Sequence, residues 1–276
     1  MKIDGRSLAD LVAAAAAQTA TGQPLITERK GTFGQPEAAL MVDVAIGKLL
    51  LRPSPDKQWH LKIAHEKSDR VSIETGPGGL TVRVRPTAQE STVISNVSRP
   101  GEDRVFIRQQ SVSGGGVSIV NGVVVSGGYS ALVEIQLPAG FSYAADLRID
   151  AGDLLLNPEN LTFLRLEAKA GTGQIKADLS NAAVATFRAS SGAGEIDAHL
   201  PKGANCRATL STGVGDISLT LGHNLAITLT ASVGVGDRVV RHSDLAQVSA
   251  GNWQSRGGSV RLDIMASSGA GNIRVQ

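Results

Sequence analysis

Residues 171–175, Gly-Thr-Gly-Gln-Ile, recur with small changes as Gly-Ala-Gly-Glu-Ile at 192–196 and as Gly-Val-Gly-Asp-Ile at 213–217. The second glycine of each motif belongs to a series with a spacing of 21 residues, and one more copy follows after 35 residues. The series is Gly152, Gly173, Gly194, Gly215 and Gly236, with Gly271 in the later copy. A fixed period of this length is typical of repeat architectures, so these glycines are predicted to be structural turns.

The residues between the glycines alternate in the manner of β-strands. Ile196 and Ala198 stand two and four positions after Gly194, and the polar Asp197 stands between them. Since alternate side chains of a strand point to opposite faces, one face is apolar and the other polar. The same alternation returns later in each repeat, for example at Cys206 and Ala208. Each repeat is therefore predicted to contain two strands.

The unbroken period favours an all-β fold in which the repeats stack as a β-solenoid, similar to a β-helix. A meander folded into a sandwich or a prism also gives two strands per repeat and is the alternative. The longer interval before Gly271 predicts one insertion that projects from residues 241–258. Trp253 lies in this insertion, which makes it a candidate for contact with a partner.

Three segments are expected along the chain. Residues 1–24 are predicted to form a helix that caps or docks on the body, because Ser7-Leu-Ala-Asp10 has the form of a capping box. Residues 25–140 are predicted to be an antiparallel β region that precedes and continues into the repeat region, residues 141–276. Within it, Asn121 and Gly122 favour a tight hairpin turn and are the second candidate for partner contact.

Composition excludes several classes of protein. The 276 residues carry 27 basic and 25 acidic side chains, a net charge of +2, which argues against nucleic acid as a partner. No apolar run approaches the roughly 20 residues that span a bilayer. The first residues do not resemble a signal peptide, so a cytoplasmic location is the default expectation.

The aromatic and cysteine content constrains the interior. There are five Phe, two Trp and two Tyr against 32 glycines, so Val, Ile, Leu and Ala must fill the core. Cys206 is the one cysteine, which excludes an intramolecular disulfide. It occupies an apolar column of the repeat and is expected to be a buried, unreactive thiol.

An acidic or amide side chain follows each repeat glycine. The acidic members of this column are Asp153, Glu195, Asp216 and Asp237. We expect them to accept hydrogen bonds from backbone amides at the turns, as Asp and Asn commonly do. A cation site is the alternative, although the 21-residue spacing differs from that of the calcium-binding nonapeptide solenoids.

The chain has no motif for a nucleotide, a metal cofactor or a catalytic nucleophile, so we predict neither catalytic residues nor a cofactor. A polysaccharide-acting enzyme could draw a pair of carboxylates from Asp178, Glu195 and Asp197. A solvated strand face places charge at the same positions.

The Gly-x-Gly-Asp/Glu-Ile repeats resemble the bacterial putative-adhesin domain family, whose biochemical function is unknown. The resemblance covers about residues 130–276 and includes Val133-Glu-Ile-Gln-Leu-Pro-Ala-Gly140, which leads into Ala151-Gly-Asp-Leu154. It implies a scaffold of stacked β-strands with no catalytic residues. It also implies association with the cell envelope, in contrast to the default drawn from the first residues.

The sequence therefore predicts a noncatalytic scaffold that binds another protein, or a second copy of itself, through exposed strand edges, the Asn121-Gly122 hairpin or the Trp253 loop. The alternative is a carbohydrate-binding or carbohydrate-acting protein. Its usual sign is outward aromatic side chains for stacking on sugars, and the repeat strands offer almost none.

Overall fold

The computed structural model describes residues 24–66, 69–86, 91–97, 106–112, 118–120, 123–125, 131–255 and 257–276. These residues form strands, turns and irregular segments, with no helix among them, so the described fold is all-β. No helix in this part of the chain is long and apolar enough to cross a bilayer. The helix predicted over residues 1–24 lies outside the described residues, of which Pro24 is the first, as does the turn at Asn121 and Gly122.

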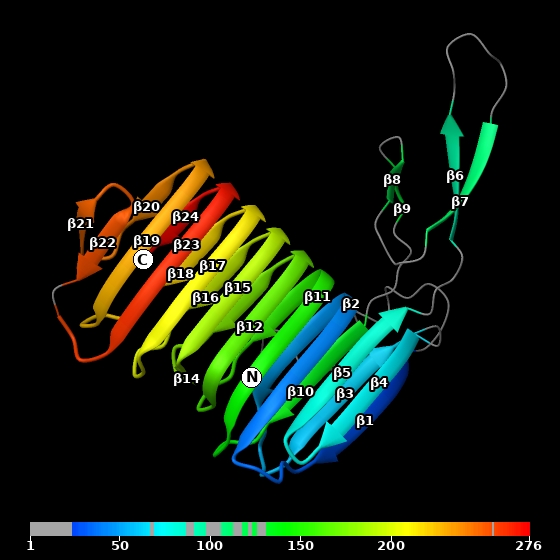
Figure 1. Cartoon of the computed structure of the whole chain (residues 1–276), viewed down its shortest axis with the longest axis horizontal. Helices are drawn as coiled ribbons and strands as arrows, with labels where there is room; N and C mark the ends of the chain where they lie inside the picture. The colour runs from blue at the N-terminus through cyan, green and yellow to red at the C-terminus, as the bar shows by residue number, and fades with distance from the viewer. Residues whose placement is uncertain are drawn as a thin grey trace.

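Twenty strands make one large sheet (Figure 1). They are β1 (Leu25–Gly31), β2 (Glu37–Pro53), β3 (Trp59–His65), β4 (Asp69–Gly76), β5 (Gly79–Pro86), β10 (Ala131–Leu137), β11 (Ser142–Leu156), β12 (Thr162–Thr172), β13 (Ile175–Asp178), β14 (Ala183–Val184), β15 (Thr186–Ala193), β16 (Ile196–His199), β17 (Cys206–Val214), β18 (Ile217–Thr220), β19 (Ala226–Val235), β20 (Arg238–Val240), β21 (Leu245–Ser249), β22 (Asn252–Ser255), β23 (Arg261–Ala270) and β24 (Ile273–Val275). Two hairpins pair only within themselves: β6 (Ser91–Val97) with β7 (Phe106–Val112), and β8 (Ser118–Val120) with β9 (Val123–Val125).

The large sheet runs as two rows of strands that join in β2 and β11. The long-strand row has the order β4, β5, β2, β11, β12, β15, β17, β23, β19, β22, β21. The short-strand row has the order β1, β3, β10, β2, β11, β13, β16, β18, β24, β20. Both β2 and β11 contain a glycine with positive φ, Gly47 and Gly152, after which they continue from the first row into the second.

Successive repeats pair in parallel, with partners one period apart. In the short-strand row Ile175 pairs with Ile196 and Ile196 with Ile217, so each residue lies beside its equivalent. In the long-strand row Phe187 pairs with Ala208 in the same way. This pairing differs from the antiparallel neighbours that a meander requires.

The order of the repeats in space differs from their order in the sequence. The last repeat, β23 and β24, lies between β17/β18 and β19/β20. Gly271 therefore stands between Gly215 and Gly236, rather than after Gly236 as its sequence position suggests. In the N-terminal region, too, the order in space differs from the order in the sequence. Strand β2 lies between β5 and β10 on one side and β11 on the other, and it pairs in parallel with all three.

The insertion predicted to project from residues 241–258 folds back onto the stack instead. Its strand β22 pairs antiparallel with β19, and β21 pairs with β22, so the two strands extend the long-strand row at its far end. Trp253 pairs with Leu229 and is 9% exposed. The prediction of a projecting loop was wrong, because the apolar Trp253 gains more by joining the core than by facing water.

One hydrophobic core fills the space between the two rows. The repeats supply it with Ile, Leu and Ala in columns, for example Ile175, Ile196 and Ile217, all fully buried. The larger rings gather in the N-terminal part, where Tyr143 lies 5.9 Å from Phe33 between ring centroids. The Tyr143 hydroxyl donates to the Pro138 carbonyl oxygen at 2.6 Å, and burial raises the pKa of Tyr143 well above its ordinary value.

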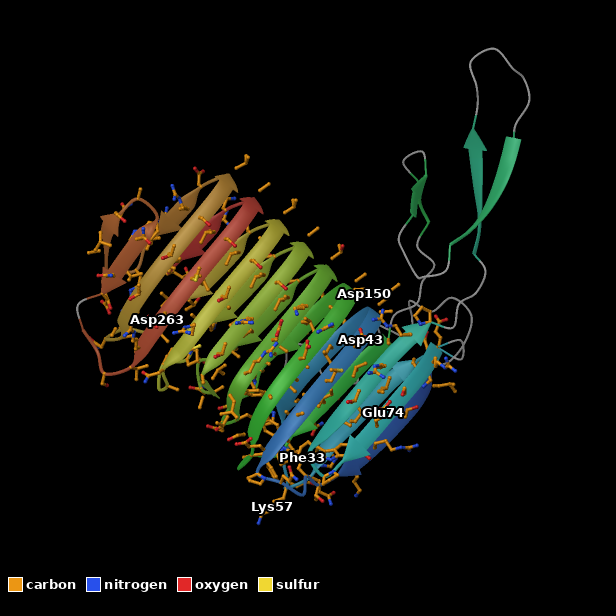
Figure 2. The ribbon with its side chains drawn as sticks, in the orientation of Figure 1. Phe33, Asp43, Lys57, Glu74, Asp150 and Asp263 are labelled. Atoms are coloured by element: carbon orange, nitrogen blue, oxygen red, sulfur yellow. The ribbon has the colours of Figure 1, made fainter. Side chains whose placement is uncertain are left out.

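The outer face of the long-strand row carries several ion pairs. Figure 2 shows Asp43 on β2 and Asp150 on β11 close together, and Arg85 on β5 forms an ion pair with each. Further along the row, Glu167 is paired with Arg165 and Lys169, and these two contacts lower the pKa of Glu167 to about 2. The charged groups of each of these two clusters are thus paired with one another.

The repeat glycines form a continuous column along the stack. Their φ angles lie between 125° and 148°, a region that L-residues with side chains rarely adopt. A Cβ atom on Gly194 would lie 1.9 Å from the carbonyl oxygen of Gly173, and one on Gly215 would lie 2.1 Å from that of Gly194. The space of each missing side chain is therefore occupied by the backbone of the neighbouring repeat.

The close packing of the glycine column predicts that Gly194→Ala greatly lowers the unfolding free energy. The added methyl group meets a backbone carbonyl in a backbone conformation that disfavours it, so we expect a loss of about 3–6 kcal/mol in unfolding free energy. Urea denaturation followed by circular dichroism measures it. Gly203→Ala is the control, because its Cβ would meet nothing within 4 Å. Equal stability of the two variants would contradict the role given to the column.

Candidate functional site

The stack ends differently at its two ends. At the N-terminal end each row finishes in a strand that has one neighbour among the described residues: β1 pairs with β3, and β4 pairs with β5. Figure 1 shows β1 and β4 together at this end, opposite β21 and β22. A strand with one neighbour presents a row of unpaired N–H and C=O groups, which is a template for another strand. We call β1, β4 and the cleft between them the open end.

The cleft of the open end has a volume of about 780 Å³. Its apolar surface comes from Trp59 on β3 and from Val71 and Ile73 on β4. Its polar surface includes Arg29 and Lys30 on β1. In the described part of the chain neither cation forms an ion pair with a carboxylate, unlike Arg85, Arg165 and Lys169 on the outer face of the long-strand row. The cleft thus joins an apolar floor to a rim on which the two cations outnumber the one lining carboxylate, Asp69.

Local sequence shapes the floor of this cleft. Gly31 lies on β1 opposite Trp59, and a Cβ on Gly31 would lie 2.7 Å from the indole Cζ2. The glycine therefore gives the indole ring room against β1. Phe33 follows with its ring centroid 6.4 Å from that of Trp59, and the backbone amide of Gly34 donates to the Pro77 carbonyl oxygen at 2.9 Å. These contacts join β1, β3 and the turn after β4 around one cavity.

His65 lines the cleft with both ring nitrogens engaged. Its Nδ1 lies 2.8 Å from the carbonyl oxygen of Glu66, which can only accept, so Nδ1 carries the proton. Its Nε2 then accepts from the Thr27 hydroxyl, 3.1 Å away. The residue is 7% exposed. A histidine with both nitrogens occupied joins β1 to β3 and offers no free lone pair to a substrate.

The acidic column predicted from the repeats lies on the outer face of the short-strand row. Asp216 accepts the backbone amide of Asn272 in the neighbouring repeat at 2.8 Å, and the Asp153 carboxylate lies 3.5 Å from the amide of Gln174. Glu195 accepts instead from the side-chain amide of Gln174, at 3.1 Å. These contacts follow the predicted turn-amide pattern at Asp153 and Asp216, across neighbouring repeats rather than within one turn.

No three of the carboxylates Asp153, Glu195, Asp216 and Asp237 come together as a metal-binding group in the described ranges. The group of ligating side chains that does meet there is His223, His242 and Asp244, in the loops that follow β18 and β20. Periodicity could have indicated part of it, since His223 and Asp244 stand 21 residues apart.

The remaining predicted contact residues have separate positions. Strands β8 and β9 flank Asn121 and Gly122 and pair in antiparallel register through Val120 and Val123, as a hairpin requires. Trp253 belongs to the core, so it does not present the surface contact predicted for it. Cys206 is 4% exposed, and burial raises the pKa of its thiol to about 12, which keeps it protonated and unreactive.

No protein-family model matches the chain, and a search of curated proteins finds no match. Solved structures do match. A putative cell adhesion protein from Clostridium sporogenes has a TM-score of 0.56 and 15% sequence identity, over 91% of this chain and 98% of that one. The two chains share a fold. A putative adhesin from Bacteroides fragilis is 12% identical over 91% of this chain and 97% of that one, with a TM-score of 0.31.

Asp216→Ala tests the acidic column. The variant loses the acceptor of the Asn272 amide and the ion pair with Arg274, so we expect about 1–2 kcal/mol less unfolding free energy at pH 7. The Asn272 amide is the main cause that lowers the pKa of Asp216. Because the pKa of Asp216 is lower in the folded than in the unfolded state, its carboxylate stabilises the fold above the unfolded pKa of about 4. The difference in unfolding free energy between wild type and Asp216→Ala should therefore shrink as the pH drops below that value.

Asp237→Ala is the matched control for this column. Asp237 ends the column, and its carboxylate accepts no hydrogen bond from the described residues, so its removal should change unfolding free energy by less than about 0.5 kcal/mol. Millimolar calcium should leave the melting temperature of wild type and both variants unchanged. A calcium-dependent rise that Asp216→Ala abolishes would favour the cation site instead.

Proposed function

We propose that the chain is a noncatalytic, adhesin-like scaffold that binds an extended segment of another protein, or of a second copy of itself, at the open end. The observation that carries the proposal is the pair of edge strands, β1 and β4, each of which has one neighbour among the described residues, on either side of a cleft with an apolar floor. A segment that adds to such an edge gains backbone hydrogen bonds, and its alternate side chains enter the cleft.

The proposed scaffold is a β-solenoid in which each 21-residue repeat makes one turn. Its support is the parallel pairing of residues one period apart and the glycine column that runs through the same repeats. Such a stack is stiff and needs no cofactor, which suits a protein that presents a binding end. The shared fold with a protein named for cell adhesion supports an adhesive role and a location at the cell envelope.

The chemistry of the cleft indicates what kind of segment it takes. Trp59, Val71 and Ile73 favour apolar side chains, and Arg29 and Lys30, which form no ion pair among the described residues, favour an acidic side chain beside them. We therefore propose an extended peptide segment that alternates apolar and acidic or polar residues. Carbohydrate is less well supported, because most of the aromatic rings of the described residues lie in or against the core, where they cannot stack on a sugar: Phe33, Phe141, Tyr143, Phe163, Phe187 and Trp253.

Peptide display supplies a probe while the natural partner is unidentified. A random peptide library is selected on the immobilised protein, and the enriched peptides are measured against variants. Ile26→Lys with Thr75→Lys places a charge on each free edge strand at exposed positions, and charges on edges oppose strand addition. We expect this double variant to bind at least about tenfold more weakly, a loss of about 1.4 kcal/mol.

The matched control is Ala144→Lys with Met265→Lys, which adds the same charge to exposed positions of β11 and β23, strands with neighbours on both sides. It should bind the peptides as wild type does. Sedimentation of the protein alone distinguishes a second copy from another partner. Two results together would contradict the proposal: the library yields no enriched peptide, and the protein binds a glycan array equally well as wild type and as the edge variant.

A further inference from the structure

Two loops meet beside β24 in the short-strand row. One follows β18 and the other follows β20, and β24 lies between these two strands. The first loop is fixed by the Leu221 amide, which donates to the Gln276 carbonyl oxygen at 2.9 Å. The second loop is fixed by the Arg241 amide, which donates to the Val275 carbonyl oxygen at 2.8 Å. The loops thereby bring the rings of His223 and His242 to 4.9 Å between centroids.

A carboxylate completes the group. His223, His242 and Asp244 each offer one ligating atom, and the three atoms lie within 4.8 Å of one another. The His223 Nδ1 and the Asp244 Oδ2 are 3.5 Å apart. Among the residues that the structure describes, no other such group of histidine, cysteine and carboxylate side chains occurs.

The carboxylate is held in place from both sides. Asn224 has a positive φ of 59°, and its amide donates to the Asp244 Oδ2 at 2.9 Å. The Ser243 hydroxyl donates to the Oδ1 at 3.0 Å. These hydrogen bonds lower the pKa of Asp244, so it is an anion at neutral pH. The loop after β18 therefore positions a negative charge that belongs to the loop after β20.

The two histidines differ in freedom. His242 is 6% exposed, and its buried Nε2 has no hydrogen-bonding partner among the described residues, which is a costly state for a polar atom. Its Nδ1 accepts from the Asp244 amide over a long 3.3 Å. The side chain of His223 is 69% exposed and can change its rotamer without disturbing the core.

We infer that His223, His242 and Asp244 bind one divalent transition-metal ion of the zinc class, with water in the fourth position. Two imidazole nitrogens and one carboxylate oxygen are ligands that zinc prefers, whereas calcium and magnesium prefer oxygen alone. The ion lies between the loops after β18 and β20 and ties them together across β24. It thereby holds the intercalated last repeat in place.

The distances suit such an ion after a small rearrangement. Tetrahedral zinc with bonds of about 2.0–2.2 Å places its ligand atoms about 3.4 Å apart. The His223–Asp244 separation already matches, and the exposed His223 can close the remaining gap. Coordination at His242 Nε2 moves the ring proton to Nδ1 and opens the long contact with the Asp244 amide, so the ion replaces one weak hydrogen bond.

Zinc titration of the protein, with every purification tag removed, tests the site. Isothermal calorimetry should give one zinc ion per chain, and zinc should raise the melting temperature in a manner that a chelator reverses. His223→Ala and Asp244→Asn should each weaken zinc binding by at least about tenfold, since loss of even an outer-shell partner costs that much. The exposed position of His223 keeps its variant folded.

His60→Ala is the matched control, because His60 Nε2 lies 3.0 Å from the Asp56 carboxylate and forms a histidine–aspartate pair without a third ligand among the described residues. It should bind zinc as wild type does. No saturable zinc binding by wild type, or equal zinc binding by wild type and His223→Ala, would overturn the inference. Peptide binding at the open end is a separate measurement, so failure of one proposal leaves the other standing.

Discussion

Each repeat glycine leaves room for the carbonyl of its neighbour, and the rest of the stack depends on that contact. With a Cβ at Gly173, Gly194 or Gly215, adjacent turns would have to separate by more than the β-ladder allows. The column therefore fixes where every repeat bends. Once the bend is fixed, the remaining strand residues of a repeat lie beside their equivalents in the neighbouring repeat. The Ser191, Thr212 and Ser268 hydroxyls reinforce the column, because each donates to the carbonyl of a column glycine.

This constraint acts on neighbours in space and is indifferent to order in the chain. Gly271 accommodates the carbonyl of Gly215, and Gly236 accommodates that of Gly271, as well as any consecutive pair would. The last repeat can therefore lie between two earlier ones. Its intercalation leaves β19 on the outside, and the chain that connects β20 to β23 supplies β21 and β22 to cover that edge. The cap at this end thus follows from the unusual order of the repeats.

The sequence predicts the parts of the fold that are local or periodic. The phase of the strands, the inward column that includes Cys206 and Ala208, and the turns at the repeat glycines are encoded by spacing alone. The predicted series begins at Gly152, although Gly47 stands five periods before it and has Leu49 and Leu51 at the same two- and four-residue offsets as the apolar residues of the repeats. The order of the repeats could not be predicted, because repeats that satisfy the same column are physically interchangeable. The fate of Trp253 depended on that order.

The candidate sites lie beyond prediction for a related reason. Residues of β1 and β4 alternate like those of paired strands, and only the assembled stack shows that each lacks a second neighbour among the described strands. Many charges on the faces of the stack are paired with one another, as Glu167 is with Arg165 and Lys169. Within the described ranges, strand edges and cations without an ion pair lie at the open end, and a buried imidazole nitrogen without a hydrogen bond lies where the loops after β18 and β20 meet. Two further buried atoms without a hydrogen bond, Arg52 Nε and Glu134 Oε2, lie on β2 and β10, before the regular 21-residue series begins. A periodic stack satisfies its interior by repetition, so binding capacity concentrates at its interruptions.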